Sequence, residues 1–111
     1  MPAILSSRLK NYFTNSSRTR GAEYFVEGRI SIDQGSASSV DAHVDGTEVY
    51  DVRLNLRDDV LAASCDCPYF KNFGTFCKHV WGTLLAAQQH KHLSAAVSAK
   101  DLRMRFVSNG T

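Results

Sequence analysis

All three cysteines of this chain lie within one stretch of fifteen residues, and a histidine closes that stretch. The order is Cys65, Cys67, a spacer of nine residues, Cys77 and His79. Three thiolates and one imidazole make a complete ligand set for tetrahedral Zn²⁺, which binds such donors at about 2.0–2.3 Å. An ion with four protein ligands is coordinatively saturated and cannot activate water. The stretch therefore predicts one structural Zn²⁺ and no catalytic role for it.

The spacing within each pair of ligands indicates the backbone that must hold it. Residues two apart at the end of a β-strand point to the same face, so Cys65 and Cys67 can reach one ion from there. Cys77 and His79 cannot do this from a regular helix, where two positions amount to about 200° of rotation. We therefore expect Cys77 in a loop and His79 at the start of a helix.

Two other interpretations of these residues remain open. One is a buried thiol cluster without metal, which the clustering of every cysteine makes the weaker interpretation. The other is a Cys-His hydrolase that uses Cys77 with a histidine base, although the metal pattern already uses both residues. The chain has no glycine-rich phosphate loop ending in Lys-Ser or Lys-Thr. We therefore predict that it is not an enzyme.

The pattern Cys-x-Cys, spacer, Cys-x-His resembles the SWIM zinc finger, and the flanking residues agree with it. These flanks are Cys67-Pro68-Tyr69-Phe70 and Cys77-Lys78-His79-Val80, the latter leading into Leu84-Leu85-Ala86. The resemblance implies a ββα zinc module, as found in bacterial Swi/Snf-type helicase-like ATPases, Mutator-type transposases and partners of recombinases. In those proteins it is assigned to DNA or protein binding. Such modules usually belong to larger chains, so we expect a piece of a larger protein or a free-standing adaptor.

Charge is distributed unevenly along the chain. Residues 1–20 contain four basic and no acidic residues, residues 21–70 three basic and ten acidic, and residues 71–111 six basic and one acidic. If the two ends fold side by side, they form one positive face opposite an acidic sheet, which is typical of nucleic-acid binders. The alternative is that these side chains are ordinary solvated charges. The candidate phosphate contacts are Arg18, Arg20, Lys71, Lys78, Arg103 and Arg105.

The spacer between the ligands is rich in aromatic residues. Such rings usually shield a small zinc site from water, but one or two could stack on bases or contact a partner protein. Phe73, between Asn72 and Gly74 at the expected loop tip, is the best candidate for a partner contact. Lys78, between two ligands, could donate to a phosphate or offset the thiolate charge.

Apolar periodicity predicts an α+β fold. Leu5, Leu9 and Phe13 indicate a helix within an N-terminal helical segment over 3–26, which Asn15-Ser16-Ser17 interrupts. Alternation then predicts a meander of four antiparallel strands from Ile30 to Cys67, with a tight type I′ turn at Asp45-Gly46. The main helix is expected over Lys78–Gln89 and a last amphipathic helix over Leu93–Phe106. Gly82 should mark a close approach between the main helix and another element.

These observations predict one domain over residues 1–111, with its zinc module at about 48–90. Because no signal peptide or membrane span stands out and the cysteine number is odd, we expect a cytoplasmic protein. The predicted function is a non-catalytic zinc module that binds DNA or another nucleic acid, as part of or partner to a helicase-like remodelling ATPase. The alternative is a protein-interaction adaptor that uses the zinc-stabilised surface.

Overall fold

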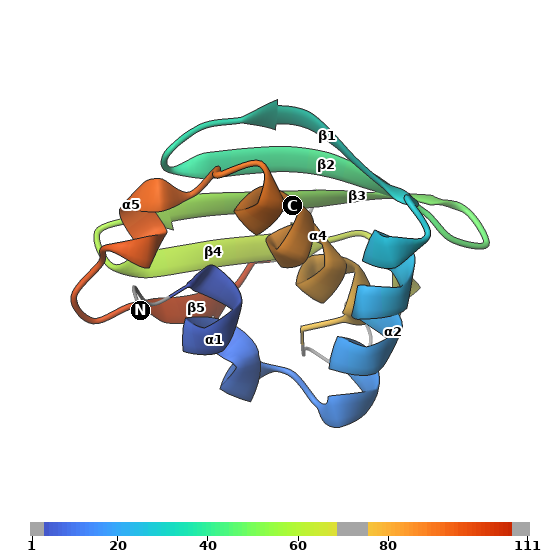
Figure 1. Ribbon diagram of the computed structural model, residues 1–111, viewed down its shortest axis with the longest axis horizontal. Coiled ribbons are helices and arrows are strands. Elements are labelled where there is room, and N and C mark those ends of the chain that lie inside the picture. Colours follow the sequence, from blue (N-terminus) through green and yellow to red (C-terminus); the bar gives the residue numbers. More distant parts are fainter. Residues whose placement is uncertain (1–3, 69–75, 108–111) are drawn as a thin grey trace.

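Five β-strands form one twisted sheet, and helices α1, α2 and α4 lie on the same side of it (Figure 1). The computed structural model describes residues 4–68 and 76–107. The spatial order follows the chain order: β1 (Ile30–Gly35), β2 (Ser39–Asp45), β3 (Val49–Arg57), β4 (Val60–Cys65) and β5 (Arg103–Phe106). Neighbouring strands are antiparallel from β1 to β4, whereas β5 is parallel to β4.

The alternation of apolar and polar residues gives the sheet one buried and one open face. Along β3, Tyr50, Val52 and Leu54 are buried, while the residues between them are exposed. Val44 pairs with Tyr50 and Val52 pairs with Cys65 across the strands, so the buried sets coincide on one face. This register brings the first cysteine to the core side of the sheet.

The helices cover that buried face. They are α1 (Leu5–Leu9), a 3₁₀ turn η1 (Lys10–Tyr12), α2 (Asn15–Val26), α4 (Lys78–Gln89) and α5 (Ser94–Val97). Helix α4 is the most buried, with Val80, Trp81 and Leu84 in the core. Helix α2 packs against α4. Its N-cap is Thr14, whose side chain accepts a hydrogen bond of 3.1 Å from the Ser17 N–H. That bond satisfies one of the free amides at the start of α2.

Helices α2 and α4 cross at two glycines, which confirms the close approach expected at Gly82. A Cβ atom on Gly82 would lie 2.9 Å from the Gly21 carbonyl oxygen, and one on Gly21 would lie 2.6 Å from the Lys78 carbonyl oxygen. Neither site has room for a larger residue. The crossing therefore places the start of α4 directly against α2.

All four strands of the predicted antiparallel meander are present, but the sheet has a fifth strand that was not predicted. Residues 103–106 form a fifth strand, so the helix expected over Leu93–Phe106 is reduced to the single turn α5. Residues 103–106 form a strand because they pair with β4, which places Met104 beside Leu61 with both side chains buried. The expected break at Asn15-Ser16-Ser17 is also wrong, since these residues form the first turn of α2. Leu5, Leu9 and Phe13 are buried as predicted.

The hairpin after β2 is confirmed, but its turn differs from the prediction. Residues 46–48 separate β2 from β3, and Gly28 is the one described glycine with a positive φ, so Gly46 does not form the expected type I′ turn. The two-residue turn lies instead at Asp58-Asp59, where Asp58 has φ 55°. Among the described residues, no helix is both long and apolar enough to cross a membrane.

Candidate metal centre

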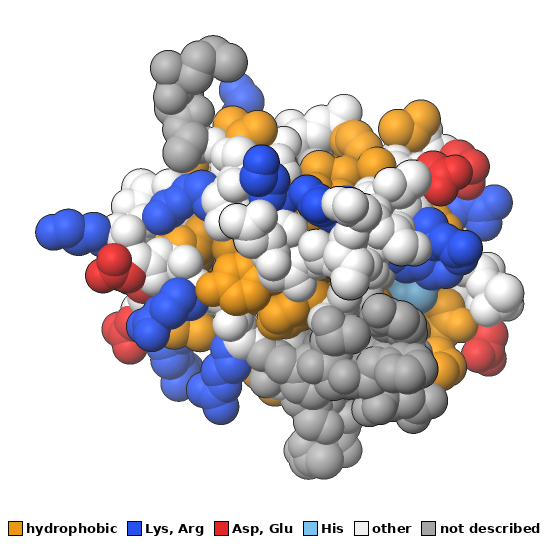
Figure 2. Space-filling view, turned by 90° about the horizontal axis from the view of Figure 1, so that it is seen from below, with side chains coloured by type: hydrophobic (Ala, Val, Ile, Leu, Met, Phe, Trp, Pro, Cys, Tyr) orange, Lys and Arg blue, Asp and Glu red, His pale blue; other side chains and the backbone are white. Residues whose placement is uncertain are grey.

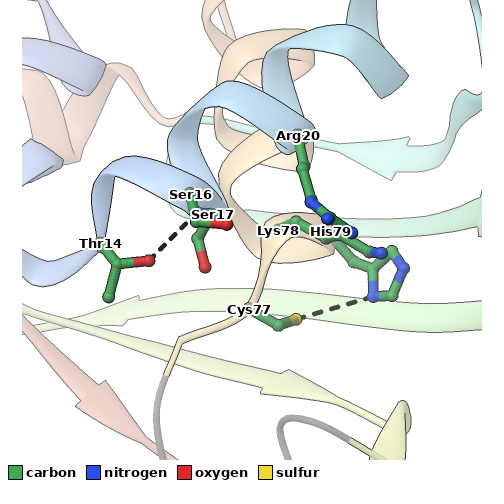
Figure 3. A pocket seen from close by; sticks show the side chains of 7 residues that line it. All are labelled: Thr14, Ser16, Ser17, Arg20, Cys77, Lys78 and His79. Atoms are coloured by element: carbon green, nitrogen blue, oxygen red, sulfur yellow. Dashed lines mark hydrogen bonds between the residues drawn. The ribbon is translucent and has the colours of Figure 1, made fainter.

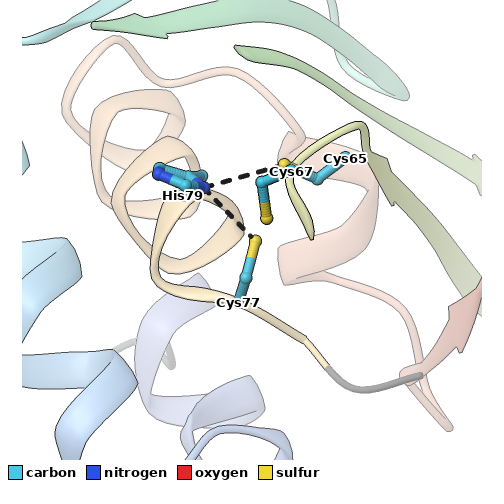
Figure 4. Close-up of side chains that lie close together, drawn as sticks. All are labelled: Cys65, Cys67, Cys77 and His79. Atoms are coloured by element: carbon cyan, nitrogen blue, oxygen red, sulfur yellow. Dashed lines mark hydrogen bonds between the residues drawn. The ribbon is translucent and has the colours of Figure 1, made fainter. Parts of the chain in front are cut away.

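The four predicted ligands meet where β4 ends and α4 begins (Figure 4). Cys65 is the last residue of β4, and Cys67 follows two positions later, beyond the strand that was expected to include it. Cys77 is the N-cap of α4 with extended backbone, φ −96° and ψ 172°. His79 lies in the first turn of α4. The expectation of a non-helical Cys77 followed by a helical His79 is therefore confirmed.

The distances between the donor atoms fit one tetrahedral ion. His79 Nδ1 lies 3.8 Å from Cys65 Sγ and 3.7 Å from Cys77 Sγ, and the four donor atoms all lie within 4.8 Å of one another. Donors bound at 2.0–2.3 Å to a tetrahedral Zn²⁺ are separated from one another by about 3.5–3.8 Å. The donor set and its spacing therefore fit one structural Zn²⁺, held through the Nδ1 atom of His79.

Burial makes these thiols hard to ionise without a metal. The side chains of Cys65, Cys67, Cys77 and His79 are at most 4% exposed. Hydrogen bonds with Cys67 and Cys77, together with burial, raise the pKa of the Cys65 thiol. For Cys77, the Cys65 thiol lowers the pKa, but the Cys67 thiol and burial outweigh this effect and raise it to about 12. Because Zn²⁺ binds thiolates, its binding here must displace protons, and acid favours its release.

Aromatic rings enclose the histidine side of the site. The His79 imidazole lies 4.7 Å from the Tyr50 ring and 5.5 Å from the Tyr24 ring, centroid to centroid. On the other side of α4, Trp81 packs on Phe13 at 5.0 Å, and Phe13 contacts Phe76 at 5.7 Å. Trp81 and Phe76 therefore belong to the packed shell, as expected for a site shielded from water. The other spacer aromatics, including Phe73, lie outside the described residues.

Asp66, between the first two ligands, is a supporting residue that sequence reasoning missed. Its carboxylate accepts a hydrogen bond of 2.9 Å from the backbone N–H of Asp51, and its own N–H donates to the Asp51 carbonyl at 3.4 Å. These two bonds continue the β3–β4 ladder past the end of β4. They fix the turn that brings Cys67 back toward Cys65. The sequence signal that could have pointed to this supporting role is the acidic residue between Cys65 and Cys67.

A cavity of about 150 Å³ adjoins the metal centre between α2 and α4 (Figure 3). Its described lining consists of Thr14, Ser16, Ser17, Arg20, Cys77, Lys78 and His79. The two predicted phosphate-binding residues Arg20 and Lys78 thus come together, although they are far apart in the sequence. No described carboxylate lines this cavity.

The remaining predicted basic residues do not join that cavity. Arg18 lies two positions before Arg20 on α2, and its guanidinium donates to the Asn15 side chain. Arg103 and Arg105 are exposed on β5, next to Val60 and Ala62 in register, and so lie on the open face of the sheet. Figure 2 shows Lys and Arg side chains in separate groups over the visible face. The single positive face expected from the sequence is therefore not formed by the described residues, and Lys71 lies outside them.

The open face of the sheet changes in charge from one edge to the other. Asp33, Asp41 and Asp51 line a hollow over β1–β3, whereas Arg57 and Arg105 line another beside β4 and β5. The expected acidic sheet is therefore acidic over only part of its surface.

Residues 50–88 match the family model of the SWIM zinc finger. The matched segment runs from β3 into α4 and contains all four donor residues. A search of curated proteins and a search of solved structures both find no match to this chain. The family match and the cluster of donors agree on the same residues and the same ion.

Proposed function

We propose, from the match of residues 50–88 to the SWIM zinc finger, that this chain is a non-catalytic binding module for nucleic acid, DNA above all. In this proposal the zinc centre is structural, and basic residues beside it contact phosphate groups. We further propose that the module acts inside the cell as part of, or partner to, a helicase-like remodelling ATPase. That association rests on the resemblance of the zinc-binding segment alone.

The observation that carries the proposal is the convergence of Arg20 and Lys78 on one cavity beside the metal centre. Contacts from such side chains to phosphate are independent of base sequence and sensitive to salt. The four protein donors support a non-catalytic role, because they leave no coordination position for water or substrate. The zinc site then serves to hold α4, and with it Lys78, in a fixed position against α2.

A second candidate function is protein binding through apolar surface next to the spacer. Tyr12 is 37% exposed and packs edge-to-face on Phe76, with ring centroids 6.0 Å apart. An exposed aromatic residue in contact with a buried cluster is a common anchor in protein interfaces. This surface would serve the adaptor role that the sequence left as the alternative.

A salt titration of DNA binding separates these functions. The affinity of the zinc-loaded chain for a fluorescently labelled duplex would be measured by anisotropy between 50 and 300 mM salt. Two phosphate contacts, from Arg20 and Lys78, predict a log–log slope of about −2, whereas all six predicted residues would give about −5. Absence of binding at the lowest salt would reject the nucleic-acid function and favour the adaptor.

A further inference from the structure

The cavity beside the metal centre has the features of an oxyanion site. Both of the long helices α2 and α4 start at it, because their N-caps Thr14 and Cys77 belong to its lining. The N-terminus of a helix carries a partial positive charge and free backbone N–H groups that point outward. Two such termini, each from a helix of 12 residues, are therefore directed toward one small volume.

Side chains add charge and hydrogen-bond donors to this volume. Arg20 reaches from α2 toward the His79 imidazole, with Lys78 beside it (Figure 3). Arg20 makes no hydrogen bond or ion pair with any described residue, while the Lys78 ammonium lies 5.3 Å from the centre of the Tyr24 ring. The side chains of Ser16 and Ser17 contribute hydroxyl groups to the lining. Guanidinium, ammonium and hydroxyl groups are the usual partners of phosphate oxygens.

An unpartnered buried atom gives an independent indication of a ligand. His79 is 4% exposed and lines this cavity, and its Nε2 atom has no hydrogen-bond partner among the described residues. When Nδ1 faces the metal, Nε2 carries the proton and must donate it. Histidines that bind metals nearly always give this second N–H to an acceptor, and leaving it buried and unpaired is unfavourable. An anion in the cavity would supply the acceptor.

The charge balance permits an anion here in spite of the thiolates. Zn²⁺ with three thiolates and one imidazole has a net charge of −1, whereas Arg20 and Lys78 each carry +1. The adjoining hollow, formed by Arg20, Tyr24, Arg29 and Lys78, also contains the carboxylates of Glu23 and Glu27, and Arg29 is paired with Glu27 at 2.7 Å. The cavity beside the zinc centre has no described carboxylate in its lining. Of these two hollows, it is the one suited to an anion.

We infer that this cavity binds a tetrahedral oxyanion of the phosphate class, and that a backbone phosphate of the nucleic acid occupies it. Arg20 and Lys78 supply the charge, the starts of α2 and α4 supply backbone N–H groups, and His79 Nε2 donates from the metal centre. The identity of the phosphate's source rests on the proposed function, whereas the oxyanion site does not. Zinc and phosphate would thus bind to opposite nitrogens of one imidazole.

The test uses the full zinc-loaded chain and inorganic phosphate at constant ionic strength. Nitrogen-15 NMR spectra would follow the backbone amides of Ser16 and Lys78 and the Nε2–H signal of His79. We expect saturable shifts at these groups, and affinity about tenfold weaker in Arg20→Gln and in Lys78→Gln. Arg53→Gln and Lys100→Gln are the matched controls, because both residues are exposed and lie outside the cavity. Their phosphate affinity should be unchanged.

Zinc content must be measured for every variant. If Arg20→Gln and Lys78→Gln lose zinc but keep phosphate affinity, the two cations only offset the thiolates and the inference is overturned. Linear, unsaturable shifts would also overturn it. Retained zinc with weakened phosphate binding supports it.

Repeating the titration with duplex DNA separates this inference from the proposed function. Phosphate binding that depends on Arg20, without any DNA binding, keeps the oxyanion site and rejects nucleic acid as its source; a phosphoserine peptide is then the next probe. DNA binding that is equally strong in Arg20→Gln and Arg53→Gln keeps the function and rejects a DNA phosphate as the occupant of this cavity. Parallel loss of phosphate and DNA affinity in Arg20→Gln supports both.

Discussion

At the scale of single residues, His79 links the metal to its surroundings. Its Nδ1 faces the sulfur atoms of Cys65 and Cys77, while its ring is held between Tyr24 and Tyr50. The Thr83 hydroxyl also donates to its carbonyl at 2.8 Å within α4. The two ring contacts restrict the imidazole, so the ligand is oriented before the ion arrives. A preorganised ligand loses less conformational entropy when it binds.

His43 gives a residue-level prediction about pH. Its Nδ1 lies 3.0 Å from an Asp33 carboxylate oxygen. This hydrogen bond raises the pKa of His43 above 6.5; burial lowers that pKa, and the charges of Asp33, Asp45 and Asp51 raise it. A raised histidine pKa means that the pair stabilises the fold below about pH 6.5 and stops doing so as pH rises through the folded pKa.

Asp33→Asn should therefore lower the pKa of His43 toward 6.5, as measured by NMR titration of the imidazole. Glu48→Gln, which removes a carboxylate that does not contact His43, is the control and should leave that pKa in place. An unchanged pKa in Asp33→Asn would contradict the assigned contact.

At the scale of elements, the crossing of α2 and α4 positions everything on the helix side of the centre. The crossing brings Gly21 against the backbone of Lys78, the residue between two ligands. Helix α2 therefore holds the first turn of α4 in place, and the cavity beside the metal exists because the two helices start close together. The same contact explains why a glycine occupies the middle of each helix, where it is otherwise unfavourable.

Gly21→Ala should destabilise the chain by about 1–3 kcal/mol, because the new methyl group meets backbone atoms that cannot move independently. In an uncrowded helix the same change would stabilise by up to about 1 kcal/mol, so the sign of the effect is diagnostic. Urea unfolding followed by circular dichroism measures it. Thr19→Ala, at an exposed position of α2, is the control and should change stability little. A stabilised Gly21→Ala variant would contradict the close crossing.

The elements that the sequence predicts well are those whose pattern is local. β3 alternates over its whole length, and the ligands of the zinc centre lie within fifteen residues. The strand β5 was missed because Leu102 and Phe106 are four apart, as in a helix, whereas its true partner Leu61 is distant in the chain. Helix α2 was cut short because Asn15-Ser16-Ser17 resembles a turn until the cap by Thr14 is seen. In β5 the pairing with a distant strand outweighed local propensity, and in α2 the side-chain cap by Thr14 did so.

At the scale of the whole molecule, the two ends of the chain are tied together by a residue whose charge is used internally. The Arg8 guanidinium donates to the carbonyls of Val97 at 2.9 Å and Ala99 at 2.5 Å. In the sequence, Arg8 adds to the positive charge of residues 1–20, which we expected to lie on the surface. The distribution of charge along the sequence therefore overstated the positive surface, and the described phosphate-binding candidates reduce to a small group beside the metal and a separate group on β5.

The zinc centre completes this arrangement, because it joins the end of the sheet to the start of α4. Closing such a site supplies on the order of 10 kcal/mol in zinc-finger peptides. Cys67→Ser should therefore lose zinc and unfold at least residues 65–90, seen as lost helical circular dichroism and altered Trp81 fluorescence. Ser64→Ala, beside the site but without a donor role, is the control and should keep both signals.

The most direct test of the central claim is elemental zinc per chain, measured on protein purified without added metal and confirmed by native mass spectrometry. We predict one tightly held zinc ion per chain, absent from Cys67→Ser. A wild-type chain that is folded and contains no zinc would contradict the claim. Cys77 and His79 would then have to be reconsidered as a reactive pair.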